Sequence, residues 1–161
     1  MTGKEYNTCV DAYADSVYRF ILKNLKNEED ARDVVQSAFE KMWINHEKIV
    51  NDTAKSYLYT VAYHQMIDFI RKNKRIQHRE EFGEHERIDR AAPIGLKPLL
   101  EKALDQLTTL QKSLVLLKDY EGYSYEEIGK ITGLNGSQVK VYLHRARLQL
   151  KQYIGKPENI I

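Results

Sequence analysis

The residues of this chain that could do chemistry are cations gathered on one stretch near the C-terminal end. Residues 136–153 contain no acidic side chain and four basic ones: Lys140, Arg145, Arg147 and Lys151. A basic helix can bind phosphate groups, and the residues of its first turns can reach base edges. Charge alone also allows a solvated face on an ordinary amphipathic helix, so the flanking sequence matters.

The sequence before this stretch is typical of a helix-turn-helix. Ser124 and Glu127 form an S-x-x-E capping box that begins one helix, and Gly133 suits the left-handed residue that ends it. Asn135 or Ser137 can cap a second helix after a turn of about four residues. Two helices joined in this way, with the second one basic, favour binding in the major groove of DNA.

The second helix has two distinct faces. Its apolar residues follow the spacing of a stripe that faces a core: Val139, Leu143, Ala146 and Leu150. The side chains that fall largely off this stripe are Ser137, Lys140, Val141, His144 and Arg145. This second set is the candidate DNA-reading face.

Aromatic and basic residues also follow one another between positions 57 and 75. Tyr57, Tyr59 and Tyr63 precede a basic cluster at residues 71–75. Stacking rings followed by cations suit single-stranded DNA. Two ordinary explanations stay open, because tyrosines often cover the edge of a core and basic residues near a helix C-terminus favour the helix dipole.

The composition argues against an enzyme. The 161 residues carry a net charge of only +2, so any nucleic-acid surface must be local. Cys9 is the single cysteine, which excludes an internal disulfide and a multi-cysteine zinc site. There is no Ser/His/Asp or Cys/His arrangement, glycine-rich phosphate loop or metal-ligand spacing. We therefore expect no catalytic residues, metal, cofactor or small-molecule substrate. Without a signal-peptide pattern or a long apolar run, we expect a cytoplasmic protein.

The repeated helical spacing predicts an all-α chain of two small helical domains. Long helices are expected at about 6–25, 28–45 and 54–75, within a first domain at 1–76. Residues 77–97 are charged and carry Gly83, Pro93 and Gly95, which predicts a linker. A second domain at 98–161 would hold two short helices and the helix-turn-helix. Trp43 is expected in the core, because its ring is large and apolar.

Both predicted domains contain motifs that resemble the sigma-70 family of bacterial transcription initiation factors, in particular its small extracytoplasmic-function (ECF) group. Residues 30–43, which run from Asp30-Ala31-Arg32-Asp33 to Trp43, resemble region 2.2. Residues 57–64 and 68–71 resemble regions 2.3 and 2.4. Residues 107–111 and 120–129 resemble region 4, and residues 139–140 and 143–147 its recognition helix. The resemblance covers almost the whole chain in the right order.

The resemblance implies roles for particular residues. The residues implied to bind the clamp of the polymerase largest subunit are Asp33, Gln36, Ser37, Glu40 and Lys41. The loop implied to capture a flipped base of the −10 element contains Asn51, Asp52 and Thr53. The rest of the −10 face would comprise Tyr59, Tyr63, His64, Asp68, Arg71, Lys72 and Arg75. The −35 element would be read by Ser137, Gln138, Lys140, Val141, His144 and Arg145.

The expected function is that of an alternative sigma factor. It would bind core RNA polymerase at the clamp and flap, recognise promoter DNA and help to open the duplex. The resemblance also leaves room for an anti-sigma factor as a further partner. The alternative is a helix-turn-helix regulator that binds DNA without acting as a sigma subunit, and the surface of the 28–45 helix would distinguish the two.

Overall fold

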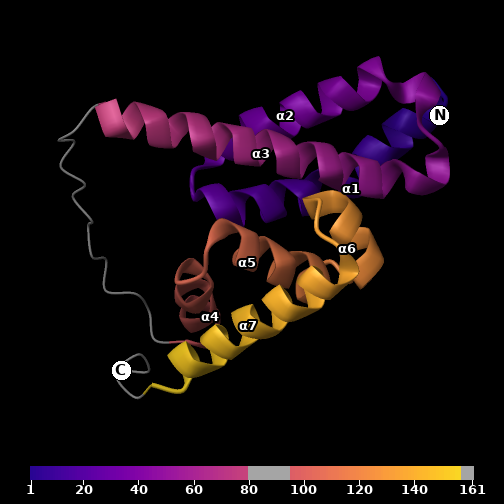
Figure 1. Cartoon of the computed structure of the whole chain (residues 1–161). Helices are drawn as coiled ribbons and strands as arrows, with labels where there is room; N and C mark the ends of the chain where they lie inside the picture. The colour runs from indigo at the N-terminus through magenta and orange to yellow at the C-terminus, as the bar shows by residue number, and fades with distance from the viewer. Residues whose placement is uncertain (80–94, 157–161) are drawn as a thin grey trace.

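The computed structural model describes residues 1–79 and 95–156, and every regular element in these residues is helical. The all-α prediction is confirmed. Helices α1 to α3 form an N-terminal domain and helices α4 to α7 form a C-terminal domain, one above the other in Figure 1.

Helices α1 (Gly3–Leu25) and α2 (Glu28–Ile44) begin at side-chain caps. Thr2 and Glu5 make a reciprocal capping box at the start of α1. Lys26 ends this helix in the left-handed conformation, with φ 61°. Asn27 then caps α2, whose first turn is acidic, as the sequence predicts.

Helix α3 (Ala54–Arg79) follows two 3-10 turns, η1 (His46–Lys48) and η2 (Asn51–Thr53). It is longer than the sequence predicts. It continues into the proposed linker, and its C-terminal end projects beyond the rest of the N-terminal domain in Figure 1. Residues 80–94, most of the predicted linker, lie outside the described residues.

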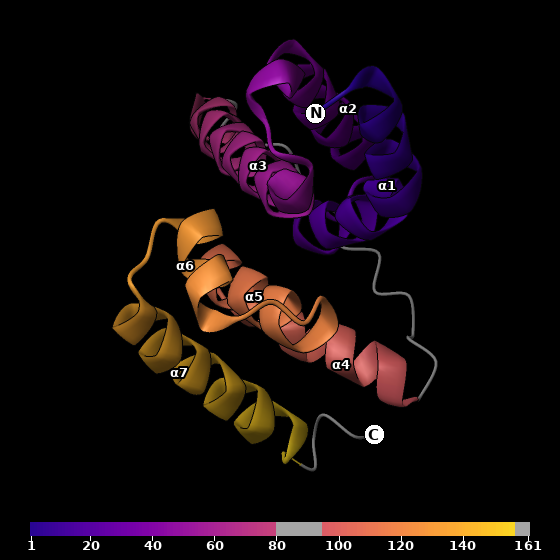
Figure 2. The same ribbon diagram turned by 90° about the vertical axis from the view of Figure 1, so that its right-hand side faces the viewer.

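The C-terminal domain contains α4 (Leu96–Asp105), α5 (Thr109–Val115), α6 (Tyr125–Thr132) and α7 (Gly136–Ile154). Thr108 and Gln111 make a capping box at α5. A π-helical turn, η3 (Leu116–Tyr120), continues directly from α5. Figure 2 shows α7 on the outer side of this domain, away from α1 to α3.

The two domains share one hydrophobic core. Buried side chains of the N-terminal domain, such as Phe20 and Leu58, belong to the same cluster as Leu114 and Ile128 of the C-terminal domain. The contact runs between α3 and α6 and between α1 and α5. Sequence spacing predicted the helices but not this packing of one domain against the other.

The prediction that Trp43 lies in the core is wrong. Its side chain is 47% exposed, near the end of α2. The indole ring stacks on the His46 imidazole, with centroids 4.2 Å apart and planes 7° from parallel, and it also contacts the Tyr6 ring at 4.9 Å. Helix α2 buries Met42 instead, so the neighbouring Trp43 points outward.

Candidate nucleic-acid interface

The helix-turn-helix is built by three local caps. The Ser124 hydroxyl accepts from the Glu127 backbone N–H at 3.1 Å and begins α6. It also donates to the Glu127 carboxylate at 2.9 Å, which differs from the reciprocal backbone bond of an ideal capping box. Gly133 ends α6 with φ 82°. Asn135, rather than the alternative Ser137, caps α7.

The turn between α6 and α7 leaves no room for a side chain on Gly129. A Cβ at this position would lie 2.6 Å from the Leu134 carbonyl oxygen, far inside contact distance. This close approach lets the backbone after α6 fold back over that helix. The hydrophobic side of α7 then meets the domain through Val139, Leu143 and Ala146, all buried.

The opposite side of α7 is open. The predicted reading residues that are exposed are Ser137, Lys140, Val141, His144 and Arg145. Gln138 is only half-exposed, and its side-chain oxygen accepts from the Asn135 backbone N–H at 3.0 Å. Five of the six predicted side chains therefore form one accessible face, whereas Gln138 is engaged in the cap.

Arg147 has a structural partner instead. Its guanidinium makes a two-pronged contact with the Asp119 carboxylate of η3, including an Nε–Oδ2 bond of 3.1 Å. These hydrogen bonds raise the pKa of Arg147 further above its ordinary value. The pair ties α7 to the turn after α5. Of the four cations in residues 136–153, Arg147 therefore has a structural role.

An open hollow of about 820 Å³ lies along the helix-turn-helix. Its lining includes Lys130, Asn135, Ser137 and Lys140, so cationic and hydrogen-bonding groups surround it. The Lys140 ammonium also lies 5.5 Å from the centre of the Tyr125 ring. A phosphate backbone could approach this hollow from the solvent side.

The residues predicted on α3 do not form a single surface. Tyr59 and Tyr63, one turn apart, are both buried. His64, Asp68 and Arg71 are exposed, and at 3.6 residues per turn they lie on roughly the opposite side of the helix. The set of DNA-binding residues predicted on α3 therefore combined side chains from two different faces of the helix.

The exposed face of α3 carries cations near its C-terminal end. Lys72 is exposed, and an Arg71 guanidinium nitrogen lies 4.0 Å from the Asp68 carboxylate. Arg75 belongs to α3, but its side chain lies outside the description. Exposed cations of this kind can follow a phosphate backbone.

The predicted loop lies beside a small pocket. Asn51, Asp52 and Thr53 are all exposed in η2. The first two line a pocket of about 180 Å³ together with residues of α1 and the start of α3, including Tyr13 and Lys55. The loop thus offers a concave, partly polar site at the edge of the N-terminal domain.

The predicted protein-binding residues share one solvent-facing side of α2. All five, namely Asp33, Gln36, Ser37, Glu40 and Lys41, are exposed. The Gln36 amide donates to the Glu40 carboxylate at 3.5 Å. The opposite side of α2 is buried through Val34, Val35 and Ala38. This geometry leaves the polar side of α2 available to a partner.

Other kinds of site receive no support from the described residues. No group of three or more histidine, cysteine or acidic side chains is placed to hold a metal there. Within the same residues, no helix combines the length and apolarity that a membrane span requires.

Family models match both domains of the chain. The model for sigma-70 region 2 matches residues 9–76, and that for sigma-70, region 4 matches residues 98–150. The RNA polymerase sigma factor SigV of Bacillus subtilis is 34% identical over 152 residues, which cover 89% of each chain. The ECF RNA polymerase sigma factor SigE of Mycolicibacterium smegmatis is 29% identical over 94% of this chain and 62% of its own.

The fold is shared with a solved sigma factor. The structure of RpoE from Bartonella quintana, in complex with the anti-sigma factor NepR, superposes with a TM-score of 0.79 at 23% identity. The match covers 96% of this chain and 99% of that one. The chain belongs to the sigma-70 family of RNA polymerase sigma factors, and it is of the ECF type.

Proposed function

We propose that this chain binds core RNA polymerase and directs it to promoters through two DNA-reading surfaces. The observation that carries the proposal is the joint exposure, on one chain, of the polar side of α2 and the reading face of α7. Two sites on one chain gain affinity through effective concentration.

The polymerase contact is assigned to α2. Its exposed Asp33, Gln36, Ser37, Glu40 and Lys41 would bind the clamp of the largest subunit, and the C-terminal domain would bind the flap. The mixture of acidic, basic and amide groups suits a polar interface in which charge complementarity selects the partner.

The promoter contacts are assigned to both domains. The pocket beside Asn51 and Asp52 would hold a base flipped out of the −10 element, and binding there would offset the few kcal/mol that unstacking costs. Exposed His64, Asp68, Arg71 and Lys72 of α3 would line the adjoining strand, with Arg75 in the same set. The exposed face of α7 would read the −35 element in the major groove.

The remaining assignments follow from the family. Sigma factors act as subunits of polymerase, so we place this chain in the cytoplasm with no catalytic activity of its own. The solved relative RpoE is bound to an anti-sigma factor, and we extend that class of partner to this chain. No cofactor or small-molecule substrate enters the proposed function.

Run-off transcription tests the proposal. Bacterial core polymerase is incubated with a pool of genomic fragments, with and without the protein. Discrete new transcripts are expected, and their aligned upstream sequences would show two promoter elements. If the protein neither binds core polymerase nor directs transcription, the proposed sigma function is wrong. The alternative, a helix-turn-helix regulator that binds DNA without polymerase, is then favoured.

A charge reversal on α2 separates these two functions. Glu40→Lys should weaken binding to core polymerase, because it reverses a charge within the proposed contact face. Asp11→Lys is the matched control, since Asp11 is an exposed acid on α1, outside that face. Both affinities are measured by fluorescence anisotropy with labelled sigma protein. Equal affinities for the two variants would remove α2 from the polymerase interface.

A further inference from the structure

One apolar side chain lies at the centre of the reading face of α7. Val139, Leu143 and Ala146 are buried and define the direction in which this helix faces its core. At 3.6 residues per turn, Val141 points about 170° away from the mean of these three directions. Its side chain is 46% exposed and lies outside the hydrophobic core cluster. The packing of the domain therefore makes no use of this valine.

Polar residues surround Val141 on the same face. Ser137 lies one turn before it, and His144 and Arg145 lie one turn after it, on either side of its direction. All three are exposed. Single exposed apolar residues are common on protein surfaces. The informative feature of Val141 is its place between groups that can donate and accept hydrogen bonds with DNA.

The depth of Val141 along α7 suits contact with bases. The residue belongs to the second turn of this helix, which begins at Gly136. The first turns of a recognition helix are the part that reaches base edges in the major groove. Leu148 points in nearly the same direction and is 47% exposed, but it lies two turns, or about 10 Å, further along the axis. The two residues thus offer the same chemistry at different depths.

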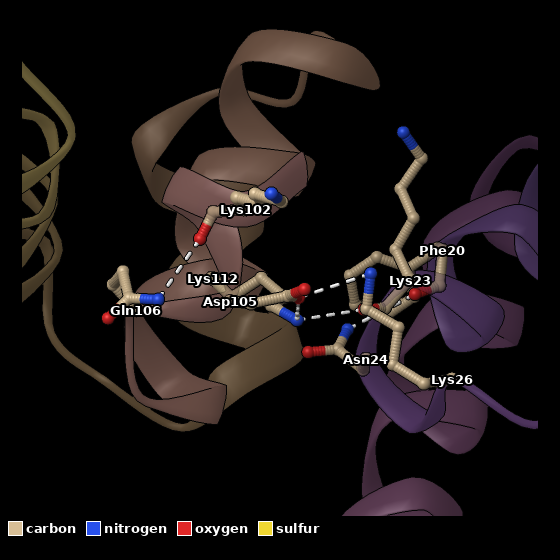
Figure 3. A network of polar contacts seen from close by, with 8 residues as sticks. All are labelled: Phe20, Lys23, Asn24, Lys26, Lys102, Asp105, Gln106 and Lys112. Carbon is tan, nitrogen blue, oxygen red and sulfur yellow. Dashed lines mark hydrogen bonds and ion pairs between the residues drawn. The ribbon is translucent and has the colours of Figure 1, made fainter. Parts of the chain in front are cut away.

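The opposite side of the C-terminal domain is occupied by the interface between the two domains. There the Lys112 ammonium donates to the Lys23 carbonyl oxygen at 2.8 Å and lies 2.9 Å from the Asp105 carboxylate (Figure 3). Helix α7 lies on the outer side of the domain, away from this interface (Figure 2). Its reading face, with Val141 at the centre, is therefore accessible to a DNA duplex.

Only one base carries an apolar group in the major groove. Guanine, adenine and cytosine present hydrogen-bond donors or acceptors there, whereas thymine presents its 5-methyl group beside one acceptor. A valine placed against guanine or cytosine would exclude water from polar groups without replacing their hydrogen bonds. A valine placed against the thymine methyl removes apolar surface of both partners from water.

We propose that Val141 is a specificity-determining residue that reads the 5-methyl group of one thymine in the −35 element. The inference rests on the proposed function and assigns one position of that element by its chemistry. Thymine is favoured there over cytosine, because cytosine carries an amino group in place of the acceptor and has no methyl group. The polar neighbours Ser137, His144 and Arg145 remain free to contact the adjoining base pairs.

The test begins with the full chain and random duplexes. Sequences enriched by binding to the wild type should share an element that contains thymine. Each thymine of that element is then replaced singly by deoxyuridine, which lacks only the 5-methyl group. Fluorescence anisotropy measures the affinity for each duplex. At one thymine the replacement should weaken wild-type binding about fourfold, the effect of withdrawing one methyl-sized group from contact.

Val141→Ala should remove the response to that methyl group. On the unmodified duplex this variant should bind about fourfold more weakly than the wild type. At the sensitive thymine, deoxyuridine should change its affinity by less than about 1.5-fold, because the partner of the methyl group is already absent. The thermal stability of the variant should be close to that of the wild type, since Val141 lies outside the core cluster.

Leu148→Ala is the matched control. It also shortens an apolar side chain that is about half-exposed on the outward face of α7. The variant should bind the unmodified duplex as the wild type does and should keep the fourfold response to deoxyuridine. A difference between the two variants then reports the position of Val141, and not a general loss of apolar surface.

Two results would overturn the inference. One is an element in which no thymine methyl group affects wild-type binding, and the other is a Val141→Ala variant that keeps the wild-type response. Either result is compatible with run-off transcripts, so the proposed function would survive it. A methyl response that depends on Val141, without any transcripts, would support the contact and reject the polymerase function. If no sequence is enriched, both are wrong.

Discussion

At the scale of single residues, two neighbouring arginines of α7 have different tasks. Arg145 is exposed on the reading face, whereas Arg147 contacts the Asp119 carboxylate with two guanidinium nitrogens. The residue between them, Ala146, is buried. At 3.6 residues per turn the two arginines lie on roughly opposite sides of α7, and the position of Asp119 decides that Arg147 is held in an ion pair.

Arg145→Ala should weaken binding to −35 DNA by about 1–3 kcal/mol if the guanidinium contacts a base, with little change in thermal stability. Arg147→Ala is the matched variant, and it should lower stability by about 0.2–1 kcal/mol, since its ion pair is partly exposed. Anisotropy with duplex DNA and thermal unfolding measure the two quantities. A loss of DNA affinity only in Arg147→Ala would mean that Arg147, and not Arg145, contacts the DNA.

Lys140 offers a prediction about salt. Its exposed ammonium borders the hollow of the helix-turn-helix and suits a phosphate contact. Lys140→Ala should weaken binding to all duplex sequences alike and reduce the slope of log K against log salt by about 1. Titrations at several salt concentrations, on specific and unrelated duplexes, measure the slope. A loss confined to one sequence would mean that Lys140 reads a base.

At the scale of elements, the helix-turn-helix depends on one close backbone approach. Gly129→Ala would place a methyl group against the Leu134 carbonyl oxygen, so the turn has to shift. We expect a loss of about 1–3 kcal/mol of folding free energy, as for other overpacked sites. Gly136→Ala is the control, because a Cβ there meets nothing within 4 Å. Urea unfolding measures both, and equal stabilities would show that the turn adapts.

The helix boundaries show which local sequence signals are informative. The starts of α2, α6 and α7 lie where the cap residues predict, because a cap is a local hydrogen bond between residues three positions apart. The end of α3 is less predictable. Its last turns continue to Arg79 through a charged segment that carries no stop signal before Gly83.

At the scale of the whole molecule, the shared core predicts cooperative unfolding. Buried residues of both domains form one continuous cluster, so neither domain keeps its full core when the other unfolds. Differential scanning calorimetry of the wild type should show a single transition. Two resolved transitions in the wild type would show that the interface contributes little to stability.

The sequence by itself determined the local structure and the family of this protein. Helical spacing predicted the all-α fold, caps predicted the helix-turn-helix, and motifs in register identified the sigma-70 family. These signals depend on residues within a few positions of each other, or on patterns that a linear chain preserves. The exposed faces of α2 and α7 follow in the same way, since a helix with one apolar stripe turns its other side to solvent.

Only the tertiary structure decided how the two domains meet. Lys112 and Lys23 are 89 positions apart in the chain, and no local pattern marks the lysine as a cap for a distant helix. The burial of Tyr59 against Tyr123 and the exposure of Trp43 have the same origin. An aromatic side chain can complete a core or lie at a surface with similar sequence spacing. Which of these it does depends on the elements that pack over it, and that packing is a property of the whole fold.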